Sequence, residues 1–139
     1  MVAVALDKNY KPSDIEDYMN DVQLQYFKEK LITWRDELMD ESIETLHHLQ
    51  EDNQAEPDLT DRATTEMNRS FELRTRDRER KLIVKIDEAL DRINDGTYGY
   101  CEETGEPIGI ARLEARPIAT LGIEAQELHE RIERTHRDE

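Results

Sequence analysis

The chain has 139 residues, of which 19 are Lys or Arg and 34 are Asp or Glu, so its formal net charge at pH 7 is -15. This charge argues against a partner held through its phosphate backbone, because such binding depends on Lys and Arg displacing counterions. Charged residues make up 38% of the chain and apolar ones 36%, which favours long, solvated helices over a large core. We therefore expect a protein partner and no direct sequence-specific binding of DNA.

The first 12 residues are expected to form a lead-in. Their apolar start, MVAVAL, is too short for a signal peptide or a membrane span, and the single cysteine excludes an intramolecular disulfide. We expect a cytoplasmic chain that does not enter a membrane. Two capping boxes follow, Ser13 with Glu16 and Asn20 with Gln23, and they predict a short helix and then a long one.

An apolar repeat with spacings of four and three predicts a coiled-coil seam on the long helix and on a second one. Numbers of facing residues in an antiparallel pair sum to a constant, and Phe27 with Ile93 and Leu49 with Phe71 both give 120, so we expect the turn near residue 60. At 1.5 Å per residue, the hairpin would be on the order of 45 to 50 Å long. The seam residues are Phe27, Leu31, Trp34, Leu38, Thr45 and Leu49, then Ala63, Met67, Leu82, Ile86, Leu90 and Ile93.

Beyond the hairpin we predict a small head. Gly96 after Asp95 is a plausible left-handed stop for the second long helix. Cys101 begins a knuckle, the segment PIGIARLEARP is expected to be extended or mixed, and a last amphipathic helix is expected over about 123–137. The fold class is mainly α, a long antiparallel coiled-coil hairpin on a small globular head. The predicted organisation is a lead-in and short helix over 1–26, the hairpin over 27–96 with its tip near 57–63, and the head over 97–139.

Four stretches of the chain carry a resemblance to a known family. PDLTDRATTE, ELRTRDRERKLI, YGYCEETGEPIGIARLEARP and LGIEAQEL resemble the DksA/TraR family of bacterial transcription factors, and the similarity runs from about Tyr18 to Leu128. The resemblance implies an N-terminal helix, a long antiparallel coiled coil, and a head with a four-cysteine zinc finger and a C-terminal helix.

The zinc positions of the family depart from its pattern here. They fall on Cys101, Thr104, Gly122 and Ala125, and one thiolate cannot hold a structural zinc, which needs four ligands. We expect no bound zinc. We hypothesise instead that the head folds by packing of apolar residues, namely Ile108, Ile110, Leu113, Ile118, Leu121, Ile123 and Leu128.

Cys101 has two interpretations, an inherited small residue, which we favour, or a redox sensor. Its neighbours Glu102, Glu103 and Glu106 bring negative charge, which disfavours a thiolate, and the chain has no resolving cysteine.

The resemblance implies that Asp58, Asp61 and Ala63 form a tip that enters the secondary channel of RNA polymerase and approaches its catalytic region. From the residues alone, Asp58 or Asp61 would be an ordinary N-cap, since carboxylates favour a helix N-terminus.

A cationic island stands out in this acidic chain, at Arg74, Arg76, Arg78, Arg80 and Lys81. It can be interpreted as a solvated helix face with favourable i,i+4 pairs such as Asp77 with Lys81, or as an anion site, because guanidinium groups suit carboxylate and phosphate. The resemblance implies a site for the alarmone ppGpp, shared with the polymerase. Its residues would be Arg78, Leu82, Lys85 and Arg116, and Gln126 stands where the family has a lysine.

The function that the resemblance implies is regulation of transcription by direct binding to RNA polymerase. Such a regulator destabilises promoter open complexes, represses ribosomal RNA promoters and favours amino-acid biosynthetic ones, with ppGpp as co-regulator in the stringent response. No nucleophile-base pair or phosphate loop is visible, so we predict no enzymatic activity, and we expect a monomer. The alternatives are a non-catalytic coiled-coil adaptor and a transcript-cleavage factor.

Overall fold

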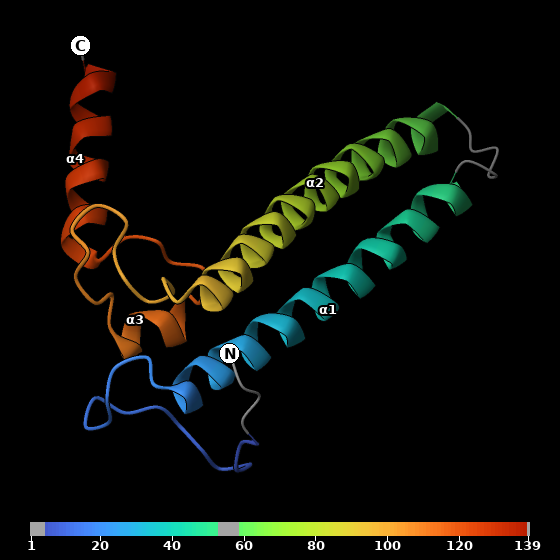
Figure 1. Ribbon diagram of the computed structural model, residues 1–139. Helices are drawn as coiled ribbons and strands as arrows, with labels where there is room; N and C mark the ends of the chain where they lie inside the picture. The colour runs from blue at the N-terminus through green and yellow to red at the C-terminus, as the bar shows by residue number, and fades with distance from the viewer. Residues whose placement is uncertain (1–4, 53–58, 139) are drawn as a thin grey trace. The chain divides into compact units, whose positions relative to one another are not determined.

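A computed structural model describes residues 5–52 and 59–138, with the backbone alone at Leu49 and at 51–52, 59–62 and 138. Four helices appear in these residues, α1 (Asp21–Asp52), α2 (Leu59–Asp95), α3 (Ile110–Ala115) and α4 (Ile123–Asp138) (Figure 1). Their only β-type pairing is one isolated bridge between Tyr100 and Pro107. The prediction of a mainly α fold is confirmed.

The chain divides into two compact units. One, which we call the terminal unit, comprises Met1–Leu31 with Glu88–Glu139 and so contains the start of α1, the end of α2, α3 and α4. The other, the paired-helix unit, is Ile32–Asp87 and consists of antiparallel segments of α1 and α2 (Figure 1).

The start of α1 follows from its capping residues. The side-chain oxygen of Asn20 accepts a hydrogen bond from the Gln23 N–H at 2.8 Å, and the amide oxygen of Gln23 accepts the N–H of Met19 at 2.8 Å. The predicted short helix after Ser13 is wrong, because residues 13–20 form only turns. The Glu16 carboxylate accepts the Ser13 N–H at 3.1 Å but also the Tyr10 hydroxyl at 2.9 Å. These contacts hold the segment as a folded lead into α1.

The end of α2 is the predicted glycine stop. Gly96 adopts a φ of +80°, a conformation that costs glycine little. The N–H of Thr97 then donates to the carbonyl of Arg92 at 3.0 Å, which satisfies a carbonyl of the last turn.

The seam of the paired-helix unit is buried only in part. Leu38 and Ile86 are buried, and Trp34, predicted to be core, is half-buried. Nearer the start of α2, Met67 and Phe71 are 73% and 64% exposed. Residue 60 belongs to the first turn of α2, and residues 53–58 between the two long helices lie outside the described residues, so the turn predicted near residue 60 stays a prediction. The apolar seam predicted on α2 is not buried at Phe71, because this side chain is exposed.

Two other predicted seam residues lie near the start of α2 and the end of α1. Ala63 is exposed, and the side chain of Leu49 lies outside the described residues. The buried positions between Phe71 and Ile86 include a carboxylate, Glu79, where a regular seam would hold an apolar residue. Between Phe71 and Ile86, α2 is therefore packed through polar as well as apolar groups.

The core of the terminal unit forms around two aromatic rings. Phe27 on α1 and Tyr98 after α2 are both buried, with ring centroids 5.8 Å apart. The Tyr98 hydroxyl donates to the carbonyl of Pro117 at 2.7 Å, so its one polar group is satisfied. This hydrogen bond joins the end of α2 to the segment after α3.

The segment predicted as extended or mixed is mixed, because it contains the helix α3 (Ile110–Ala115) between non-helical residues. Ile110 and Leu113 are both buried there, because a spacing of three places them on one helical face. Of the apolar residues expected to fold the head, Ile108 and Ile118 are also buried and Leu121 is half-buried. Ile123 and Leu128 are exposed, so they do not belong to this core.

Candidate functional site

The predicted tip falls at the start of α2. Asp58 lies outside the described residues, and Asp61 is a residue of α2 whose side chain lies outside them. Ala63 is exposed on the same helix. A carboxylate in the first turn of a helix faces the positive end of the helix dipole, which favours its charged form. The role of the tip residues stays a prediction.

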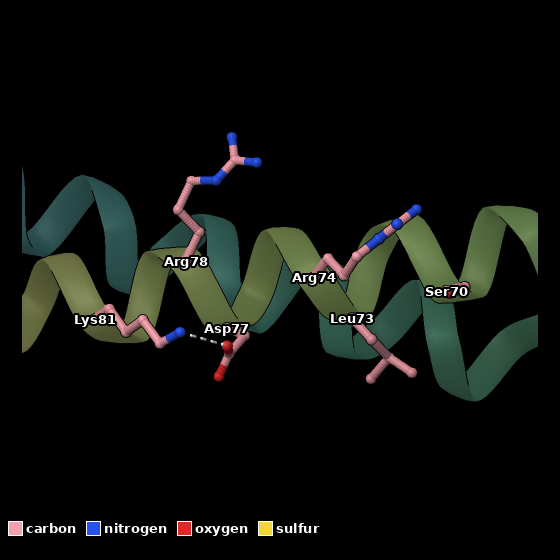
Figure 2. A pocket seen from close by; sticks show the side chains of 6 residues that line it. All are labelled: Ser70, Leu73, Arg74, Asp77, Arg78 and Lys81. Carbon is pink, nitrogen blue, oxygen red and sulfur yellow. Dashed lines mark ion pairs between the residues drawn. The ribbon is translucent and has the colours of Figure 1, made fainter. Parts of the chain in front are cut away.

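Three residues of the cationic island, Arg74, Arg78 and Lys81, line an open groove of about 450 Å³ on α2, within the paired-helix unit. Figure 2 shows Arg78 rising above the α2 ribbon and Arg74 extending from its upper side toward the right, while Lys81 and Asp77 face each other on the lower side. The Lys81 Nζ lies 3.2 Å from the Asp77 carboxylate, so the predicted i,i+4 pair is confirmed. The lining residues are Ser70, Leu73, Arg74, Asp77, Arg78 and Lys81.

This groove can hold an anion through its two arginines. In the part of the chain that the structure describes, Arg74 and Arg78 form no ion pair, whereas Lys81 is engaged by Asp77. Arg76, also in the island, is half-buried and does not line the groove. The sequence analysis did not single out Arg74 and Arg78 as residues of one groove, although their spacing of four indicates a shared helical face.

The residues expected to contact ppGpp fall into two sets. Arg78, Leu82 and Lys85 follow one another on α2 at spacings of four and three, which places them along one side of the helix. Arg116 is the exposed residue that ends α3, and Gln126 on α4 donates its side-chain N–H to Glu130 at 3.2 Å. Both belong to the terminal unit.

The knuckle at Cys101 is closed by backbone hydrogen bonds. The N–H of Gly105 donates to the carbonyl of Cys101 at 2.9 Å, and the N–H of Cys101 donates to the carbonyl of Glu106 at 2.8 Å. Gly105 has a φ of +73°, the left-handed conformation that such a tight turn requires. These two bonds and the glycine conformation define the turn of the knuckle.

The thiol of Cys101 is buried, and hydrogen-bond donors lie around its sulfur. The hydroxyl of Thr104 and the backbone N–H of Gly122 are the main donors, and together with other backbone N–H groups they lower the pKa of the thiol to about 7. The expectation that neighbouring glutamates disfavour the thiolate is wrong. Glu102, Glu103 and Glu106 are all exposed, so water screens their charge, whereas the hydrogen-bond donors contact the sulfur.

The residues at the four zinc positions do not fit zinc. Cys101, Thr104, Gly122 and Ala125 line one cavity of about 220 Å³, but they offer a single thiolate. Nowhere in residues 5–52 and 59–138 do three or more His, Cys, Asp or Glu side chains gather as a metal site. His129 on α4 is the histidine nearest in sequence to the four zinc positions, and its ring nitrogen contacts the Glu103 carboxylate. Thr104 acts as a hydrogen-bond donor to the sulfur where a ligand would stand.

Comparison with known proteins gives consistent matches over most of the chain. Residues 23–93 match the family described as DnaK suppressor protein DksA, N-terminal domain, and residues 96–131 match the prokaryotic dksA/traR C4-type zinc finger. The RNA polymerase-binding transcription factor DksA of Caulobacter vibrioides strain NA1000 is 63% identical over 131 residues, which are 94% of this chain and 92% of that protein. Its namesake from Escherichia coli K12 is 46% identical over 130 residues, 94% of this chain and 86% of that one.

A solved structure agrees with these matches. The transcription factor DksA2 from Pseudomonas aeruginosa superposes with a TM-score of 0.79 at 44% identity, covering 84% of this chain and 90% of that one. The antiparallel helix pair and the knuckle, which keeps one of the four zinc-finger cysteines, define a helical protein with a degenerate zinc finger. With a relative 63% identical along nearly its whole length, the chain belongs to the DksA family.

Proposed function

We propose that this chain is a transcription factor that binds RNA polymerase and acts through its secondary channel on the stability of promoter open complexes. The observation that carries this proposal is the 63% identity, over 94% of the chain, to a relative named as an RNA polymerase-binding transcription factor. The match spans 92% of that relative, so no large part of it lacks a counterpart here.

The tip residues Asp58, Asp61 and Ala63 act within the polymerase in this proposal. Two carboxylates brought into the secondary channel can alter the charge near the catalytic region without performing chemistry themselves. Regulation then depends on where the tip is held, and it requires no catalytic group in this chain. The factor would repress ribosomal RNA promoters and favour amino-acid biosynthetic ones.

The co-regulator ppGpp binds at Arg78, Leu82, Lys85 and Arg116 together with the polymerase. The exposed Arg78 guanidinium and Lys85 ammonium support this assignment, because both suit phosphate groups. Gln126 supplies no charge where the family has a lysine. We therefore expect weaker binding of ppGpp than in a relative that keeps the lysine.

The terminal unit folds without zinc in this proposal. A structural zinc contributes roughly 10 to 16 kcal/mol of apparent binding free energy in small fingers, which this chain must replace by packing. The buried side chains of Phe27, Tyr98, Ile110 and Leu113 support that replacement. Each contributes about 1.5 to 3 kcal/mol when it leaves water.

We also propose that the factor acts as a monomer in the cytoplasm. A net charge of -15 on each copy disfavours self-association through mutual repulsion. In the residues that the structure describes, no helix has the length and apolar character of a membrane span.

The experiment is multi-round transcription by purified bacterial RNA polymerase from a ribosomal RNA promoter. It compares reactions with and without this protein and ppGpp, and repeats them with the variant Asp61→Asn. We expect inhibition that ppGpp enhances and that Asp61→Asn removes, while the variant still binds the polymerase. If the folded protein has no effect, the adaptor interpretation replaces the proposal, and release of short 3′ fragments from stalled complexes would identify a cleavage factor.

A further inference from the structure

A row of exposed apolar side chains follows one side of α1 within the paired-helix unit. Ile32, Met39, Ile43 and Leu46 are 39%, 40%, 57% and 36% exposed. Their spacings of seven, four and three are those of a coiled-coil seam, and we call this row the α1 stripe. Leu38, adjacent to Met39, is buried, so α1 has a second apolar row besides the one packed in the core.

The spacing sets this row apart from ordinary surface residues. Exposed apolar side chains that occur singly are common and need no explanation. Met39, Ile43 and Leu46 instead stand at i, i+4 and i+7, which is the pattern by which one helix presents anchors to another helix. The unbranched side chain of Met39 can adapt its shape to a partner. The α1 stripe therefore has the form of a docking surface for a helix.

Charge around the stripe indicates which kind of helix would fit. Over residues 32–48 the acidic residues are Asp36, Glu37, Asp40, Glu41 and Glu44, and all five are exposed. The only Lys or Arg in that range is Arg35, which lies 2.7 Å from the Asp87 carboxylate. A helix with basic residues beside its apolar ones would therefore be attracted, whereas a second copy of α1 would bring the same acids and be repelled.

We propose that the α1 stripe docks an amphipathic helix of RNA polymerase whose apolar face is flanked by Lys or Arg. This inference rests on the proposed function, because that function supplies the partner. The apolar side chains of the partner pack against Met39, Ile43 and Leu46, and its basic groups lie near Asp36 and Asp40. The stripe lies on α1 and the cationic groove on α2, so we assign the stripe to binding rather than to the regulatory effect.

The test measures binding of the full-length, fluorescently labelled protein to purified RNA polymerase in the absence of ppGpp. Ile43→Gln is compared with Ile123→Gln, a change of the same residue type at 57% and 56% exposure, respectively, the second being in the terminal unit. We expect Ile43→Gln to weaken binding at least fivefold and the double variant Met39→Gln/Ile43→Gln at least tenfold, while Ile123→Gln changes it less than twofold. Circular dichroism confirms that each variant keeps its helices.

A second arm tests the charge requirement. Asp36→Asn with Asp40→Asn should weaken binding at low salt and reduce its dependence on salt concentration. If the wild type binds and the double variant Met39→Gln/Ile43→Gln binds equally well, this inference is wrong and the proposed function stands. If the wild type does not bind the polymerase, both are wrong. A dimer in sedimentation velocity that Ile43→Gln dissociates would assign the stripe to a second copy and overturn the inference.

Discussion

Replacing Glu79 should make the protein more stable. Glu79 lies on α2 in the paired-helix unit with only 7% of its surface exposed, and its Oε2 atom has no hydrogen-bond partner among the described residues. Burial raises the pKa of this carboxyl, and the negative charge of Glu41 on α1 raises it further. A buried charge without a partner opposes folding, so both Glu79→Leu and Glu79→Gln should increase the free energy of unfolding at pH 7.

The expected gain in the free energy of unfolding has two parts: the cost of the unsatisfied polar group, which Glu79→Leu removes, and the burial of a leucine side chain, which it adds. A buried polar group left unsatisfied costs about 1 to 3 kcal/mol, and a buried leucine side chain contributes about 1.5 to 3 kcal/mol. Because the Glu79 charge can be partly relieved by protonation, we take the lower ends, about 1 and about 1.5 kcal/mol, and expect about 2.5 kcal/mol for Glu79→Leu. Glu79→Gln removes the charge but keeps a polar group, so we expect at most about 1 kcal/mol for it. In a chain of this size, 1 kcal/mol corresponds to about 2 to 4 °C in the melting temperature.

The dependence on pH has a definite sign. The native pKa of Glu79 lies above its unfolded value of about 4.3, so the penalty is absent below that pH and grows as the pH rises toward the native pKa. The wild type should therefore gain stability relative to Glu79→Gln as the pH falls from 8 through the native pKa of Glu79 toward its unfolded value of about 4.3.

The assay is thermal unfolding followed by circular dichroism across this pH range. Glu66→Gln is the control, because Glu66 is an exposed glutamate on α2 in the same unit. We expect this control to change the melting temperature by less than 1 °C, in line with other exposed sites. A melting temperature of Glu79→Leu at or below that of the wild type at pH 7 would refute the buried-charge argument.

Three further predictions concern the terminal unit. Gly99→Ala should destabilise the protein by about 2 to 3 kcal/mol and Gly96→Ala by about 1 to 2 kcal/mol in urea unfolding. Both glycines have positive φ, but a Cβ on Gly99 would lie 2.9 Å from Met19, whereas one on Gly96 would meet nothing within 4 Å, so equal losses would contradict the packing argument. The pKa of His129 is raised by its hydrogen bond to Glu103, so this pair stabilises the protein below about pH 6.5 and loses its effect as the pH rises through the native pKa. The difference in melting temperature between the wild type and His129→Gln should therefore shrink from pH 6 to pH 8, and a constant difference would exclude a titrating pair. Incubation with EDTA should leave the melting temperature unchanged, and elemental analysis that finds stoichiometric zinc with unfolding on its removal would show that the zinc-free interpretation is wrong.

Regular local patterns were sufficient to predict the main helices. The repeat from Phe27 to Leu38 predicts α1, the Asn20 cap predicts its start, and Gly96 predicts the end of α2. Each signal depends on interactions between residues a few positions apart, and the sequence contains all of that information. The family resemblance also depended on continuous motifs, and it was confirmed.

Burial and the electrostatics of the site were decided only by the tertiary structure. Periodicity treated Phe71 as equivalent to Ile86, yet one is exposed and the other buried. The spacing of Thr104 from Cys101 indicated a lost ligand, but only the fold shows that its hydroxyl donates to the sulfur and lowers the pKa of the thiol. The Tyr18 hydroxyl donates to the carbonyl of Gly99, 81 residues away, at 2.6 Å. Contacts between residues far apart in the chain decide which groups lie in the same environment. Local sequence patterns do not predict such contacts.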